Sequence, residues 1–264
     1  MGFWRANQRA ITVILVLVGS LVIWEVAART LHIQQFLLPA PSVVISELFR
    51  NPKHYAINSL ATLLVTLTGF GVALVLGVLL AVVIVHSRIM EDMLYTLLVA
   101  LNSLPKVALA PLFVMWLGTG APSKITVAVT IAIFPIVIDT ALGLRSIEPD
   151  VLNMARVMRA SRWQILRRIR FPHALPALFT GMKVAISLAL VGTIVGEFVA
   201  GGDGLGSTIL SAQGVFDTPQ VFACIFLLGV MGTVLFYGID YIERRLIPWH
   251  TSQRADSIPG AAAG

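Results

Sequence analysis

The amino-acid sequence predicts an all-α protein that crosses a membrane about six times. The chain of 264 residues is 57% hydrophobic and only 12% charged, whereas soluble domains carry about 25% charged residues. Its mean hydropathy is +0.88. Apolar runs of about 20 residues, the length that a spanning helix needs, recur along the chain between polar segments. Together these observations indicate an integral membrane protein.

Six apolar runs are long enough to cross a bilayer. They lie at about 10–28, 59–85, 93–117, 124–144, 177–200 and 220–240. The first run follows Arg5 and Arg9 as the core of a signal peptide would, but it is too long and no small-residue cleavage site follows it. We therefore interpret it as a retained span. The third run contains Pro105 and Pro111, which predicts a kinked or broken helix.

The distribution of Lys and Arg predicts the orientation of the chain. With the N-terminus in the cytoplasm, 13 of the 19 Lys and Arg residues fall in inside segments, four fall in outside segments and two fall within spans. Because inside loops of membrane proteins are enriched in Lys and Arg, both termini are expected to be cytoplasmic. We expect one membrane domain at 10–249, preceded by a tail at 1–9 and followed by a disordered tail at 250–264.

The two longer outside segments carry turn and capping signals. A short amphipathic helix is expected after Pro41, with Ser42 as its N-cap. The other segment contains the sequence GGDGLG at 201–206. It lacks the lysine and the preceding strand that a phosphate-binding loop needs, so we expect a flexible segment instead.

The longest inside segment, 145–176, is a basic loop with six arginines between residues 154 and 176. Pro149 predicts the start of a helix that ends at about Met158 or Arg159. The sequence SRWQ at 161–164 fits a capping box. It predicts a second helix that ends at about Arg170, before Pro172. Two short helices that meet at a turn form a projecting knuckle.

The first helix of the knuckle has an apolar stripe, which needs a partner. The stripe consists of Val151, Met154 or Ala155, and Met158. One interpretation is a helix that lies on the membrane surface with its arginines on anionic headgroups. The other is a docking element for a cytoplasmic protein. The capping signal in the middle of the loop favours docking.

Four of the ionisable residues in or beside the spans are candidates for a functional site, since burying a charge in lipid is costly. They are Lys106, Asp139, Lys183 and Glu197. At 1.5 Å per residue, Asp139 and Lys183 lie about 9 and 10 Å from the inner ends of consecutive spans. We expect an ion pair between them, or a contact with a substrate. Glu197 lies about 30 Å along its helix, where a residue snorkels to the surface or lines a gate.

Small residues recur along the fifth span. They are Gly181, Ala185, Ala189, Gly192, Gly196 and Ala200. Such residues let helices approach closely. The close partner is expected either within the same subunit or, as the family resemblance described below implies, across the two-fold axis of a dimer.

The basic loop resembles the EAA motif of importer-type ABC transporter permeases. That motif reads Glu-Ala-Ala, three residues, Gly, nine residues, then Ile, any residue, Leu and Pro. The matching residues are Ala155, Ile169 and Pro172, with Phe171 in place of the leucine. The departures are Asn153, Met154 and, at the glycine, Arg159. Because a left-handed arginine costs of order 1 kcal/mol, a turn that is helical or shifted by one residue is an alternative there.

Two further segments resemble the nitrate/sulfonate/taurine branch of these permeases, which includes presumed carriers of pyrimidine and riboflavin precursors. They are LPKVALAPLFVMWLGTGAPSKI at 104–125 and GEFVAGGDGLG at 196–206. The resemblance implies a type I importer fold in a bacterial inner membrane and a homodimer of permeases. It also implies two cytoplasmic ATPase subunits and a periplasmic or lipid-anchored binding protein as partners.

The resemblance assigns a role to the knuckle but no cofactor to this chain. ATP and magnesium would be bound by the partner ATPase, which would dock on the knuckle. The docking residues implied are Asn153, Met154, Ala155, Val157, Met158, Arg159, Ala160 and Ser161. Two other classes stay open on the residues alone, a membrane scaffold that anchors a cytoplasmic complex and a self-sufficient secondary transporter.

Overall fold

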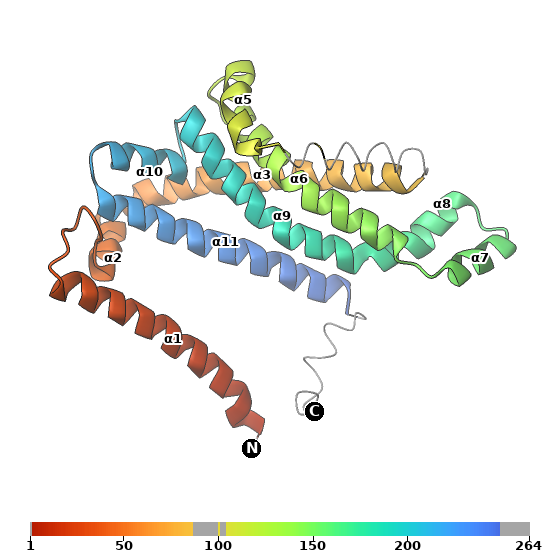
Figure 1. The fold of residues 1–264 in the computed structure, drawn as a ribbon, viewed down its shortest axis with the longest axis horizontal. Coiled ribbons are helices and arrows are strands. Elements are labelled where there is room, and N and C mark those ends of the chain that lie inside the picture. Colours follow the sequence, from red (N-terminus) through yellow and green to blue (C-terminus); the bar gives the residue numbers. More distant parts are fainter. Residues whose placement is uncertain (1, 87–99, 101–103, 249–264) are drawn as a thin grey trace.

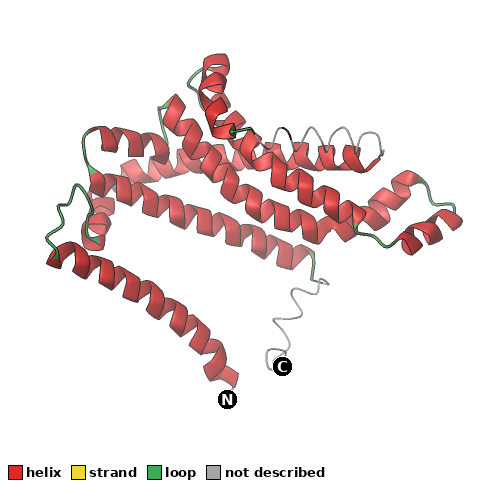
Figure 2. Ribbon diagram, viewed as in Figure 1, coloured by secondary structure: helices red, strands yellow, loops and turns green. Residues whose placement is uncertain are grey.

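The computed structural model describes residues 2–86, 100 and 104–248. Every regular element in this part of the chain is a helix (Figures 1 and 2). The elements are α1 (Gly2–Thr30), α2 (Pro41–Arg50), α3 (Pro52–His86), η1 (Lys106–Leu109), α5 (Ala110–Leu117), α6 (Ala121–Arg145), α7 (Pro149–Val157), α8 (Arg162–Ile165), η2 (Leu166–Arg170), α9 (Phe171–Ala200), α10 (Leu205–Gly214) and α11 (Thr218–Leu246). The predicted all-α class is confirmed.

Four helical stretches among the described residues are long and apolar enough to cross a membrane. They are Pro52–Val85, Ala121–Arg145, Arg162–Ala200 and Thr218–Leu246. The predicted first span, 10–28, lies within the 29 residues of α1. Much of the predicted third span lies outside the described residues. Its remainder is broken after Pro105 into the 3₁₀ turn η1 and the eight-residue α5, and Pro111 lies in the first turn of α5, where a proline is tolerated.

Helices α6 and α9 form the closest pair in the bundle, and glycines of α9 make this approach possible. A Cβ on Gly192 would lie 2.7 Å from Ala128 Cα, and one on Gly196 would lie 2.8 Å from Lys124 Cα. Both neighbours belong to α6 of the same chain. The small residues at these positions therefore serve packing within one subunit, the first of the two alternatives, because only glycine leaves room for the facing backbone.

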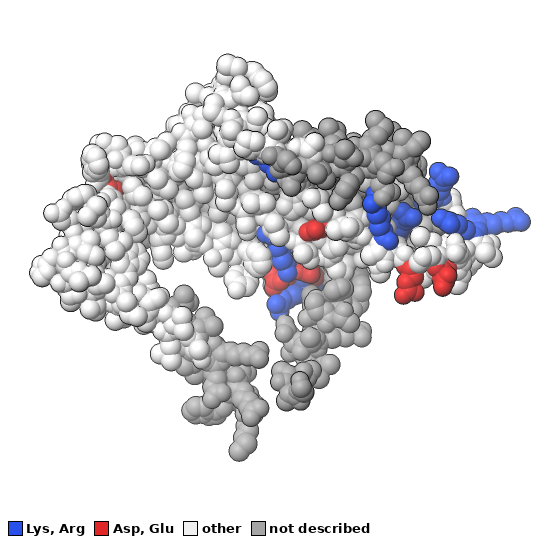
Figure 3. Space-filling model, in the orientation of Figure 1, with Lys and Arg blue, Asp and Glu red and all other residues white. Residues whose placement is uncertain are grey.

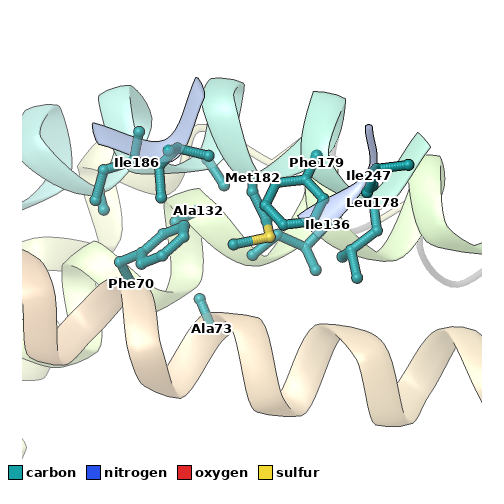
Figure 4. Packing of buried hydrophobic residues seen from close by; sticks show 12 residues of the cluster. Phe70, Ala73, Ala132, Ile136, Leu178, Phe179, Met182, Ile186 and Ile247 are labelled. Carbon is teal, nitrogen blue, oxygen red and sulfur yellow. The ribbon is translucent and has the colours of Figure 1, made fainter. Parts of the chain in front are cut away.

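The main core lies where α3, α6 and α9 meet. Phe70 of α3, Ile136 of α6 and Phe179 of α9 belong to one cluster of buried side chains (Figure 4). Ala73 and Ala132 in the same cluster have no exposed surface. Lipid is as apolar as these side chains, so van der Waals packing, rather than escape from water, stabilises this contact in a membrane.

The bundle has two distinct ends (Figure 1). The basic end carries α7 and α8, and the far end carries α2 and α10. At the far end, Ser42 is not the N-cap of α2, because the helix begins at Pro41 and Ala40 occupies the cap position. The carboxylate of Glu25 in α1 instead accepts the backbone N–H of Ser42 at 3.0 Å. A residue of another helix thus accepts one of the N–H groups in the first turn of α2 that have no partner within that helix.

Candidate functional site

The knuckle at the basic end turns at Arg159, the position of the expected glycine. Arg159 has a φ of 58°, so the left-handed turn is kept without glycine, neither helical nor shifted. The Arg159 N–H donates to Arg156 O and the Ala160 N–H donates to Ala155 O, at 2.9 and 3.0 Å. These two bonds form a Schellman motif. They satisfy the last carbonyls of α7 and hold the strained arginine.

The capping box predicted for the second helix is confirmed. The Gln164 N–H donates to Ser161 Oγ at 3.2 Å, and the Ser161 N–H donates to Gln164 Oε1 at 2.7 Å. The expected end of this helix before Pro172 is wrong. The chain continues through a π-helical turn at Leu166–Arg170 directly into α9. The Phe171 N–H donates to Leu166 O, and this wider turn, with Pro172 at the start of the next α-helical segment, accommodates a proline that would break a regular helix.

Apolar side chains of the knuckle are exposed. Val157 is 82% exposed, Met158 is 75% exposed and Met154 is 62% exposed, whereas Ala155 is buried. Lys and Arg side chains gather over the same end of the molecule (Figure 3). An apolar patch with basic neighbours that project from the bundle is typical of a protein-binding surface. We call Met154, Val157 and Met158 the knuckle patch.

Lys183 does not pair with Asp139, so the predicted ion pair is wrong. The Lys183 ammonium lies 2.5 Å from Asp240 and 2.6 Å from Glu243, both on α11. Arg244 binds the second oxygen of Asp240 at 2.8 Å. Depth alone predicted the pairing of the fourth and fifth spans, but α11 presents two carboxylates at the same level of the bundle.

Asp139 belongs to α6, and Lys106 lies against this helix. Asp139 of α6 is half-buried, and a Cβ on Gly181 would lie 3.1 Å from its Oδ2. Within the described residues no hydrogen bond or ion pair joins Asp139 to another side chain. The Lys106 ammonium lies 4.2 Å from the centre of the Phe134 ring. This cation–π contact places η1 on α6.

Glu197 lies at the end of α9, where its register predicted it, but its side chain is fully buried. It accepts hydrogen bonds from Thr62 Oγ1 at 2.8 Å and from the Gly206 N–H at 2.7 Å. The expectation of a snorkelling side chain is therefore wrong, and the segment beyond it is held rather than free. A Cβ on Gly204 (φ 130°) would overlap this carboxylate.

Three residues that the sequence did not single out, Thr62, Asn58 and Lys124, also bind the segment 203–206. We call these three residues and Glu197 the loop clamp. Thr62 Oγ1 accepts the Leu205 N–H at 2.9 Å, and Asn58 Oδ1 accepts the Gly204 N–H at 2.9 Å. The Lys124 ammonium donates to Asp203 O at 2.8 Å. Polar residues at helical spacing on the outer half of an apolar span, such as Asn58 and Thr62, are the signal that could have revealed it.

Comparisons with known proteins show the family to which the chain belongs. The family described as "Binding-protein-dependent transport system inner membrane component" matches residues 73–248. This match covers more than half of the chain, which therefore belongs to this family of ABC importer permeases. The protein is a multi-pass inner-membrane permease subunit and is not itself the ATPase.

Several relatives are similar over most of their length. The chain is 37% identical to the riboflavin transport system permease RibX of Chloroflexus aurantiacus, over 94% of this chain and 92% of that protein. It is 34% identical to the formylaminopyrimidine transport permease ThiX of Halalkalibacterium halodurans, over 94% of this chain and all of that protein. A chain of the MetNI methionine ABC transporter shares the fold, with a TM-score of 0.59 at 22% identity, over 71% of this chain and 92% of that chain.

Proposed function

We propose that this permease forms the membrane pathway of an importer and is driven by a separate ATPase that docks on the knuckle patch. The observation that carries this proposal is the exposure of Met154, Val157 and Met158 at the end of the short helix α7. A Schellman motif holds this end of α7, and the capping box of α8 follows it. An exposed methionine-rich surface suits an apolar groove in a partner. The capped turn makes the knuckle stiff enough to transmit a displacement of that partner to α9.

The arrangement in the membrane follows from the charges. We infer that the basic end and both termini are cytoplasmic, because Lys and Arg gather on that side. We further infer that two copies of the chain form a homodimer around the pathway. The partners are then two ATPase subunits on the knuckles and a binding protein at the far end, where the loop clamp lies.

The solute is a small organic molecule of the riboflavin or pyrimidine-precursor type. The relatives of 37% and 34% identity are named for riboflavin and formylaminopyrimidine transport. Those named for nitrate and aliphatic sulfonates are 30% and 29% identical. The higher identity extends over most of both chains, so we favour an uncharged heterocycle over a small oxyanion.

Uptake by reconstituted vesicles tests this proposal. Permease, ATPase and binding protein are incorporated with ATP, and the uptake of riboflavin, a formylaminopyrimidine, taurine and nitrate is measured. We expect ATP-dependent uptake of a heterocycle only when all three proteins are present. Uptake driven by an ion gradient without the ATPase would identify a secondary transporter. A complex that forms without transporting any of these or related solutes would identify a scaffold.

A further inference from the structure

A cavity of about 630 Å³ lies between the end of α3 and the knuckle. Arg156 of α7, Arg162 of α8 and Arg170 of η2 line it. The residues that line it within the described part of the chain include no carboxylate. Arg156 repels Arg170, so the three arginines concentrate positive charge that a bound anion would neutralise.

The remaining walls of the cavity are apolar. Val82 and Val85 belong to the last turns of α3, and Ile165 is a buried residue of α8. The site therefore combines guanidinium groups, which match the geometry of phosphate oxygens, with the inner end of a membrane span. A free inorganic anion would use the arginines but not the apolar wall. A phospholipid would use both.

The cavity and the knuckle patch lie on different faces of α7. Leu152 and Arg156 line the cavity, and each is two residues from Met154. At 100° per residue this places Met154 about 200° away from both. A partner that covers the knuckle patch therefore leaves the cavity facing the bundle and the membrane.

We propose that this cavity binds the headgroup phosphate of an anionic phospholipid from the cytoplasmic leaflet. The arginines hold the phosphodiester, and the apolar wall contacts the glycerol and the first part of an acyl chain. The lipid would join α3 to the knuckle. The proposal depends on the orientation of the chain and does not depend on which solute is transported.

The test titrates the purified full-length permease with phosphatidylglycerol or phosphatidylcholine and counts bound lipid by native mass spectrometry. We expect saturable binding of phosphatidylglycerol and much weaker binding of phosphatidylcholine. Arg162→Gln with Arg170→Gln should weaken binding about thirtyfold, since each basic residue near an anionic lipid surface contributes about five- to sixfold. The matched control, Arg167→Gln with Arg168→Gln, removes the same charge from exposed positions outside the cavity and should change affinity little.

Two further measurements keep the test decisive. Val85→Trp narrows the cavity at its apolar wall and retains every arginine, so it should also reduce phosphatidylglycerol binding. This variant provides the test if the charge variant fails to fold. Equal weakening by the cavity and control pairs would overturn the proposal in favour of diffuse attraction. Inorganic phosphate that raised the melting temperature as much as phosphatidylglycerol would overturn the lipid assignment. Equal binding of both lipids would also overturn it.

Discussion

At the scale of single residues, Glu197 holds the far end of the chain together. Its carboxylate lies at the first turn of α10 and accepts an N–H that has no partner within that helix. The partial positive charge of a helix N-terminus also stabilises an anion there. The same oxygen atoms occupy the space that side chains at Gly204 and Gly206 would need. In this structure the carboxylate therefore ties α3 and the start of α10 to the end of α9.

Glu197→Gln should destabilise this anchor while it preserves the volume of the side chain. A glutamine has one acceptor oxygen, so its NH₂ group faces either the Thr62 hydroxyl or the Gly206 N–H, and a buried donor is left unsatisfied. We expect a loss of about 1–3 kcal/mol and faster hydrogen exchange at 201–206. Asp203→Asn in the same loop is the control, because that residue is exposed and contributes its backbone oxygen to the clamp. Unchanged exchange in Glu197→Gln would contradict this role.

Arg159→Gly should stabilise the knuckle. Arginine at a φ of 58° costs of order 1 kcal/mol, which glycine avoids, although glycine loses more freedom on folding. We expect a small rise in melting temperature with the fold unchanged. Arg156→Gly is the control, since glycine within α7 should cost about 1 kcal/mol. If both variants lowered the melting temperature equally, the turn would not be strained.

At the scale of elements, α7 is a short helix whose exposed face needs a partner. Met158→Asp places a charge in the middle of the knuckle patch. Because burying an unpaired charge in an apolar contact is costly, we expect the ATPase to be lost when the tagged permease is purified. The measurement is the ratio of the two subunits after affinity purification.

The control for Met158→Asp is Val215→Asp at the far end. Val215 is 74% exposed, almost the same as Met158, so both variants add one charge at an exposed apolar position. The control should retain the ATPase. Retention of the ATPase and of its coupled activity in Met158→Asp would exclude docking through this patch.

Helices α9 and α11 are joined by the bridge from Lys183 to two carboxylates. Lys183→Met leaves Asp240 and Glu243 without this shared cation, so we expect a loss of about 2 kcal/mol, less than the 3–5 kcal/mol of a fully buried pair because the side chains are partly exposed. Adding Glu243→Gln should restore part of it. Thermal unfolding of the purified permease measures both. A similar loss in Asp139→Asn would instead favour a pairing of Lys183 with Asp139.

At the scale of the whole molecule, the orientation in the membrane predicts which engineered cysteines a membrane-impermeant reagent can label from outside the cell. The chain has one cysteine, Cys224, and it is buried, so a Cys224→Ala chain accepts single reporter cysteines. A membrane-impermeant maleimide should label Val215→Cys in intact spheroplasts, and Arg159→Cys only after permeabilisation. The reverse pattern would invert the chain and place the knuckle outside, where no ATPase could dock.

The sequence alone determined the features that depend on local chemistry. Apolar length predicted spans within α3, α6, α9 and α11, because a bilayer requires continuous hydrophobic helices. Pro105 predicted the break before η1, and Ser161 with Gln164 predicted the start of α8. The spacing of the motif placed the turn at Arg159, although arginine, unlike glycine, disfavours the left-handed conformation that it adopts there.

Only the tertiary structure decided which distant residues meet. The depth of a charge along its helix cannot tell which neighbouring helix faces it, so Lys183 was assigned to Asp139 when α11 supplies its partners. Likewise, Thr62 is 135 residues from Glu197 in the sequence. The two side chains nevertheless meet, and Glu197 also accepts the Gly206 N–H. The periodicity of apolar residues indicates that one face of a helix is buried. Which helix covers that face depends on packing, and residues from several elements determine the packing together.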